Sequence, residues 1–346
     1  MDIFSAENNV QVSKKLPKTF DSAILYSIVA LYYIFGSQLI ANIRGEIILV
    51  VSEIIFLALP PLLLALIRGY DIKTTFRLKA PKPLEVLLML GISPFMIIAG
   101  FCAGMTALVA VRAAFGRVYL AGEINTFMAH NLFVSLFLVA VVPAVCEEFL
   151  FRGMIQRGLE RLGAGWGIFL SGILFGLFHF DFQRLAAQTL VGLLSAYVVY
   201  RTGSIFNGMI LHFMNNGLVT LLVNLVMGTG ASTGEVVTDP FATQELMDLA
   251  NQAGMSLNQL LGLMSGVFFI LFIFCLLVIM GLLTVLRSMT KSTVDKTEEI
   301  KGSAKGLLAG IPGLLIIIIV YVSLGLTLMN NDLGQKILKI FELNLN

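Results

Sequence analysis

Residues 132–152 read LFVSLFLVAVVPAVCEEFLFR, an apolar run that ends in two adjacent carboxylates and an arginine. The part from Leu132 to Val145 is typical of a membrane span. One charged side chain at the centre of such a helix costs about 2.5–3.5 kcal/mol on insertion scales. We therefore expect Glu147 and Glu148 to face a polar cavity or to take part in a reaction.

Two later apolar stretches carry histidines. One is Phe175-Gly176-Leu177-Phe178-His179, and the other is His212-Phe213-Met214-Asn215-Asn216. The chain has 3 histidines, so these two stretches hold all but His130. That residue precedes the apolar run at Leu132, and we expect it to have a structural role.

The overall composition is that of a membrane protein. Of 346 residues, 58% are hydrophobic and 13% are charged, whereas a soluble domain is about 25% charged. The formal net charge of +2 gives no indication of nucleic-acid binding. The 3 cysteines lie scattered inside apolar runs, so we expect neither disulfides nor a cysteine metal site. The predicted fold is an all-α, polytopic transmembrane bundle.

A membrane-spanning helix needs about 20 apolar residues. Nine segments are candidates, and the fifth and sixth are short and have polar edges, so the expected number of full crossings is about eight to nine. The candidates are 22–43, 47–67, 85–111, 130–149, 167–181, 185–200, 204–227, 259–286 and 306–329.

The loops differ in charge. Loops 68–85 and 287–305 are basic, whereas 228–258 has four acidic residues and no lysine or arginine. Nine crossings put both basic loops and the N-terminus on one face and the acidic loop on the other. The positive-inside rule then predicts a cytoplasmic N-terminus and an external acidic loop.

These features divide the chain into five parts. A helix-like pattern of alternating polar and apolar residues at 152–162 is expected to leave the core and lie near the cytoplasmic interface. The predicted parts are a tail at 1–21, N-terminal spans at 22–125, a catalytic core at 126–227, an external loop at 228–258, and C-terminal spans with a tail at 259–346.

Helical spacing relates the polar residues to one another. Residues four apart share a helix face, so Glu148 can pair with Arg152, and His212 shares a face with Asn216. Glu147 is rotated from Glu148 by about 100°. Similar depths along their spans allow Glu147, His179 and His212 to meet in one polar chamber within the membrane.

Such a chamber can activate water. Glu147 would accept a proton from water that His179 helps to orient. His212 and Asn216 would donate hydrogen bonds to the oxyanion formed when water attacks a peptide carbonyl. Alternatively, Glu147, His179 and His212 could ligate zinc as in a metalloprotease. The sequence has no His-Glu-x-x-His motif, so no metal is required, although zinc is possible.

The three motifs together resemble the CPBP family, which comprises type II CAAX prenyl endopeptidases and bacteriocin-processing and immunity proteins. They are Glu147-Glu148-x-x-x-Arg152, Phe175-x-x-x-His179 and His212-x-x-x-Asn216. The resemblance covers about residues 130–220. It implies that Glu147 is the catalytic glutamate, that His179 shares its water, and that His212 and Asn216 stabilise the oxyanion. Glu148 and Arg152 would support the site.

The predicted function is therefore an intramembrane endopeptidase, and the expected location is a bacterial cell membrane. Its expected partners are membrane lipid and a membrane-associated or lipidated peptide or protein, and no nucleic acid. Two alternatives remain open. One is a catalytically silent immunity or binding protein of the same family. The other is a proton-coupled transporter, which would predict paired repeats that the sequence does not display.

Overall fold

The computed structural model describes residues 15–40, 47–118, 131–227, 239–241, 243–290 and 302–341. Within those ranges the chain is helical and has no strand, which confirms the all-α prediction. His130 and much of the acidic loop lie outside the described residues. The N-terminal elements are α1 (Thr19–Ile40), α2 (Ile47–Ser52), η1 (Glu53–Ala58), α3 (Leu59–Arg68), α4 (Ile72–Thr75) and α5 (Pro83–Phe115).

The central elements are α7 (Leu132–Leu136), η2 (Phe137–Val141), α8 (Val142–Glu148), η3 (Phe149–Ile155), α9 (Gln156–Leu159), η4 (Glu160–Leu162), α10 (Ala164–Leu177), α11 (Phe182–Thr202) and α12 (Ile205–Met227). The C-terminal elements are α13 (Gln244–Gln252), α14 (Leu257–Met289), η6 (Ala304–Gly310), α15 (Ile311–Leu328) and α16 (Asp332–Ile340).

The described residues contain 7 helices long and apolar enough to cross a membrane, so the expected count of eight to nine is corrected to about seven. The two segments that drop out are the fifth and sixth candidates. Helix α10 has only 14 residues, fewer than the roughly 20 that a crossing needs. Helix α11 has 21 residues, but Arg184, Gln188 and Arg201 make it less apolar.

Helices α10 and α11 form a tightly packed hairpin. A Cβ at Gly192 would lie 2.6 Å from the carbonyl oxygen of Gly172, and one at Gly176 would lie 3.0 Å from the backbone nitrogen of Thr189. Glycine at these positions lets the two backbones approach closely. Removing these two helices from the list of crossings lowers the number by two and leaves it odd. The basic loops and the N-terminus therefore remain on one predicted face.

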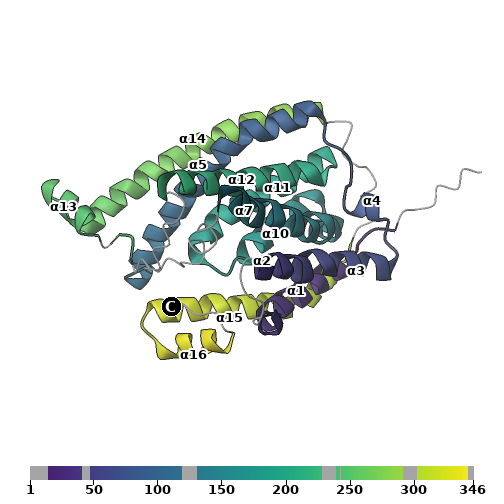
Figure 1. Cartoon of the computed structure of the whole chain (residues 1–346), viewed down its shortest axis with the longest axis horizontal. Coiled ribbons are helices and arrows are strands. Elements are labelled where there is room, and N and C mark those ends of the chain that lie inside the picture. The colour runs from purple at the N-terminus through teal and green to yellow at the C-terminus, as the bar shows by residue number, and fades with distance from the viewer. Residues whose placement is uncertain are drawn as a thin grey trace, which may run out of the picture.

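The hairpin lies in the middle of the bundle. Helices α5 and α14 pack together along one edge, and α1 packs against η6 and α15 along the other (Figure 1). Helices α10, α11 and α12 lie between these two layers (Figure 1). The segment from α7 to η4, which carries the two glutamates, packs against α12 and the η1 part of the second span.

This segment is a helix of changing pitch. Pro143 stands in the first turn of α8, and a proline inside a continuous helix removes one backbone hydrogen bond and displaces the preceding turn. The preceding turn, η2, and the later turn, η3, both adopt the wider π-helical form. Such turns redirect the side chains that follow.

The expectation that 152–162 leaves the core is wrong for most of its length, because the side chains from Arg152 to Glu160 are buried. Their polar groups bind one another and a distant arginine. Nη1 and Nη2 of Arg77 donate to the carboxylate of Glu160 at 3.0 and 2.6 Å, and Nε2 of Gln156 donates to the same carboxylate at 2.8 Å. The amphipathic pattern therefore reflects an internal polar cluster.

Candidate active site

Glu148 and Arg152 form a buried ion pair one helical turn apart. Oε2 of Glu148 lies 3.3 Å from Nε of Arg152, and neither side chain is accessible to solvent. The guanidinium also stacks against aromatic rings, with Cζ 4.7 Å from the ring centre of Phe175. This contact holds the arginine in place. Arg152 is thus fixed by a carboxylate on one side and an apolar ring on the other.

His212, on α12, lies beside both glutamates. Its Nδ1 is 3.4 Å from Oε1 of Glu148, and its Nε2 is 4.0 Å from Oε2 of Glu147. The imidazole is 1% exposed, whereas Glu147 is 14% exposed. The two adjacent carboxylates therefore reach opposite ring nitrogens of one histidine. The sequence predicted different directions for them but not that a single imidazole would bridge them.

His179 follows α10, and Phe175 lies between it and His212. Its Nδ1 lies 3.0 Å from the carbonyl oxygen of Phe175. A carbonyl only accepts hydrogen bonds, so Nδ1 donates, and in the neutral imidazole Nε2 remains an acceptor. The ring of Phe175 lies 5.0 Å from the imidazole of His179 and 5.5 Å from that of His212. Both histidines are thus packed against one buried phenylalanine.

Asn216 lies one turn beyond His212 but bonds elsewhere. Its Nδ2 donates to the carbonyl oxygen of Val139 at 2.9 Å, and its Oδ1 accepts from Asn215 at 2.9 Å. The carboxamide nitrogen carries two hydrogens, and the bond to Val139 uses one. Of the six sequence-predicted residues, Glu147, Glu148, Arg152 and His212 are thus neighbours, His179 joins them through Phe175, and Asn216 flanks them.

The predicted zinc ligands are not gathered into one ligand set. Within the described ranges, no three His, Cys, Asp or Glu side chains are grouped so that they could hold a metal ion. Zinc binding therefore stays a prediction.

Glu53 is a residue of this region that the motifs did not identify. It lies on η1, which packs against α8, and it interacts electrostatically with Glu147. Its Oε2 atom is buried without a hydrogen-bond partner, as is Oε2 of Glu147. The available signal was a carboxylate inside the apolar span 47–67, which is as costly as the glutamates on α8.

Gly208 allows α12 to approach the ion pair. A Cβ at this position would lie 2.6 Å from Oε2 of Glu148 and 2.7 Å from Cγ2 of Val199. Gly208 is one turn before His212, so the same helix face supplies both the gap for the carboxylate and the histidine that contacts it. No sequence motif pointed to this glycine.

Comparison with known proteins identifies the segment that holds these residues. Residues 129–218 match the family model described as type II CAAX prenyl endopeptidase Rce1-like. The searches of curated proteins and of solved structures found no match. The matched segment contains all three motifs, and the described helices include 7 that could span a membrane. The chain is therefore an integral multi-pass membrane protein whose residues 129–218 are similar to type II CAAX prenyl endopeptidases of the Rce1-like family.

Proposed function

We propose that this protein is an endopeptidase that hydrolyses a peptide bond of a membrane-associated or lipidated substrate with water activated by Glu147 and His179. The observation that carries the proposal is the contact of one imidazole, His212, with both glutamates of α8. Two carboxylates and two histidines in an apolar surrounding are the groups that proton transfer to and from water needs. The family match supports the same class of reaction.

In the proposed reaction, water donates one hydrogen bond to Glu147 and one to Nε2 of His179. The water oxygen bonds to the carbonyl carbon of the substrate while its proton passes to Glu147, which leaves a tetrahedral oxyanion. Glu147 then returns the proton to the amide nitrogen, and the carbon–nitrogen bond breaks. The products are a new carboxylic acid, whose proton passes to the new amine to give a carboxylate and an ammonium group, and Glu147 is again free of its proton.

His212 and Asn216 would stabilise the oxyanion. An imidazole with hydrogens on both nitrogens can donate from Nδ1 to Glu148 and from Nε2 to the developing charge. The second hydrogen of the Asn216 carboxamide provides another donor. Removing one donor of this kind typically costs a factor of about 10²–10³ in turnover.

Glu148 and Arg152 are proposed as positioning residues. Glu148 is 3.3 Å from Arg152 and 3.4 Å from His212, so its two oxygens are directed to two different partners. These two contacts hold the carboxylate of Glu148 in place. Glu147 makes no hydrogen bond at Oε2, where His212 is 4.0 Å away, and it is the more accessible of the two glutamates.

The test is proteolysis by the purified protein in detergent, with a lipidated peptide and an unlipidated peptide of the same sequence. We expect cleavage with and without a chelator, preference for the lipidated peptide, and loss of cleavage in Glu147→Ala. Glu245→Ala removes an exposed carboxylate of α13 and should cleave normally. Activity abolished by the chelator and restored by zinc would replace this mechanism with the metal-dependent one. A folded protein that binds these peptides without cleaving them would favour the silent binding protein.

A further inference from the structure

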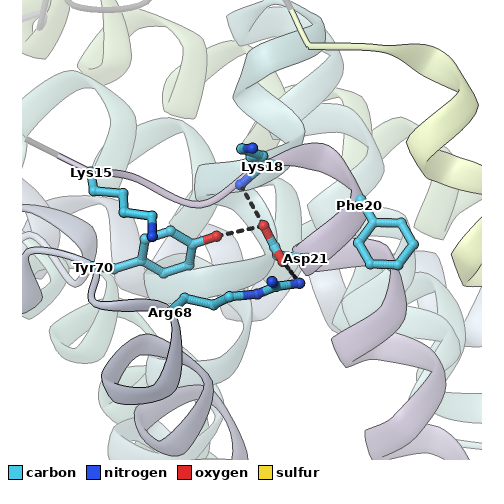
Figure 2. Close-up of a pocket in the computed structure, with 6 residues that line it drawn as sticks. All are labelled: Lys15, Lys18, Phe20, Asp21, Arg68 and Tyr70. Atoms are coloured by element: carbon cyan, nitrogen blue, oxygen red, sulfur yellow. Dashed lines mark hydrogen bonds and ion pairs between the residues drawn. The ribbon is translucent and has the colours of Figure 1, made fainter.

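A cleft with a volume of ≈ 320 Å³ opens between the segment before α1 and the end of α3, away from the candidate active site. Three of its lining side chains are basic, one is acidic and two are aromatic (Figure 2). The lining residues are Lys15, Lys18, Phe20, Asp21, Arg68 and Tyr70.

The carboxylate of the acidic residue, Asp21, already has binding partners. Oδ1 of Asp21 lies 2.8 Å from Nη2 of Arg68, and its Oδ2 accepts from the hydroxyl of Tyr70 at 2.5 Å (Figure 2). Burial and this hydrogen bond raise the pKa of Tyr70 well above its usual range, so the hydroxyl remains a donor. Asp21 therefore orients Arg68. Among the described residues Lys15 and Lys18 form no ion pair, and Nζ of Lys15 lies 5.9 Å from the ring centre of Tyr70, so the described lining carries more positive than negative charge.

The backbone that carries the two lysines is fixed. The backbone nitrogen of Asp71 donates to the carbonyl oxygen of Lys15 at 3.1 Å. Arg161 donates to the carbonyl oxygens of Leu16 and Pro17 at 3.2 and 3.1 Å. The positions from which the lysines extend are thus set by the fold, which lowers the entropy cost of ordering a ligand there.

The ends of two candidate spans place the cleft where hydrocarbon would give way to headgroups. It adjoins the start of the first span and the end of the second. Phe20 is 47% exposed, and Leu66 and Ile67, which directly precede Arg68, are 65% and 80% exposed. In a membrane such apolar side chains face acyl chains. The loops on this side of the membrane are the basic ones, which the positive-inside rule assigns to the leaflet richer in anionic lipid.

We propose that this cleft binds the phosphate of an anionic phospholipid, with Lys15, Lys18 and Arg68 around the headgroup and the acyl chains along the apolar residues beside it. Basic pockets between membrane helices bind anionic headgroups in this way. The adjoining apolar surface favours a lipid over a soluble phosphate compound, because a soluble ligand would leave that surface unused. The proposal is independent of the peptidase chemistry.

The test measures binding of short-chain phosphatidylglycerol to the purified full chain in detergent, by native mass spectrometry and by the rise in thermal stability. Short-chain phosphatidylcholine and inorganic phosphate are the comparison ligands. The double variant Lys15→Gln/Lys18→Gln removes two exposed charges. We expect its affinity for phosphatidylglycerol to fall by about 30-fold, because each basic residue near an anionic lipid contributes a factor of roughly five.

The matched control is Lys73→Gln/Lys79→Gln, which removes two exposed lysines from the neighbouring loop and should bind as the parent does. Lys15→Arg/Lys18→Arg keeps the charge and should also retain binding, which separates loss of charge from loss of folding. Equal binding by Lys15→Gln/Lys18→Gln and the parent would overturn the proposal. So would saturation of the site by inorganic phosphate alone, which would identify a soluble phosphate as the ligand.

Discussion

Nδ1 of His212 and Oε1 of Glu148 lie 3.4 Å apart across the contact between α12 and α8. Both side chains are buried, and the opposite nitrogen of the same ring points to Glu147. This relationship joins the two helices that carry the first and third motifs. It assigns each of the two adjacent glutamates to a different side of one imidazole, and the first two predictions follow from it.

Replacing His212 should reduce turnover more than substrate binding. His212→Ala removes the donor proposed for the oxyanion, so we expect kcat to fall by about 10²–10³-fold. KM should change little, because the interaction forms only in the transition state. Steady-state kinetics on the purified variant measures both constants, with Met214→Ala on the same helix as control. A rise in KM at unchanged kcat would mean that His212 binds substrate instead.

Gly208→Ala should damage the site without touching any motif residue. The added Cβ would lie 2.6 Å from Oε2 of Glu148, which Arg152 holds in place, so the carboxylate or α12 must shift. We expect at least about tenfold lower activity, since small displacements of catalytic groups are costly. Gly266→Ala is the control, because within 4 Å of its added Cβ there is no described atom apart from its chain neighbours and the nearby backbone of its own helix. Wild-type activity in Gly208→Ala would show that the Glu148 position is not critical.

The buried pair of Arg77 and Glu160 should contribute to stability. Arg77→Met leaves Glu160 with less compensation for its charge, and breaking a buried pair typically costs about 3–5 kcal/mol. Denaturant titration in detergent should show this loss, whereas Lys79→Met, at an exposed position of the same loop, should change stability by less than about 0.5 kcal/mol. If the free energy of unfolding of Arg77→Met changed as little as that of Lys79→Met, the remaining partners of Glu160 would be sufficient to stabilise its charge.

The predicted orientation can be tested by cysteine labelling in intact cells. The native cysteines 102, 146 and 275 are buried and should give little background. A membrane-impermeant reagent should label Ser232→Cys in the acidic loop and leave Ser292→Cys in the basic loop unlabelled, because positive loops remain cytoplasmic. Labelling of position 292 alone would invert the topology.

Sequence reasoning worked best where the relevant contacts are local. The apolar runs identified the helices, and four-residue spacing predicted the contact between Glu148 and Arg152, which measures 3.3 Å. Sequence reasoning failed where the partner of a polar side chain is distant in the chain. Nothing near Glu160 indicates that Arg77 binds it, so a buried segment resembled an interfacial helix.

The number of spans and the surroundings of Glu147 and Glu148 were also difficult to predict, because both depend on contacts between distant parts of the chain. Segments 167–181 and 185–200 contain enough apolar residues to suggest that each crosses the membrane. Their pairing as a hairpin depends on the close contact between Gly172 and Gly192. The bridging of both glutamates by His212 depends on how α12 crosses α8, a tertiary relationship that spacing along one helix does not define.

The most direct test of the central claim compares Glu147→Gln with Glu148→Gln in turnover by purified, folded protein. Glutamine keeps the size of the side chain but cannot act as a base. We expect Glu147→Gln to lose at least ~10²-fold in kcat, whereas Glu148→Gln should lose less turnover and more folded yield. Near-normal turnover in Glu147→Gln together with an inactive Glu148→Gln would rule out Glu147 as the base and assign that role to Glu148.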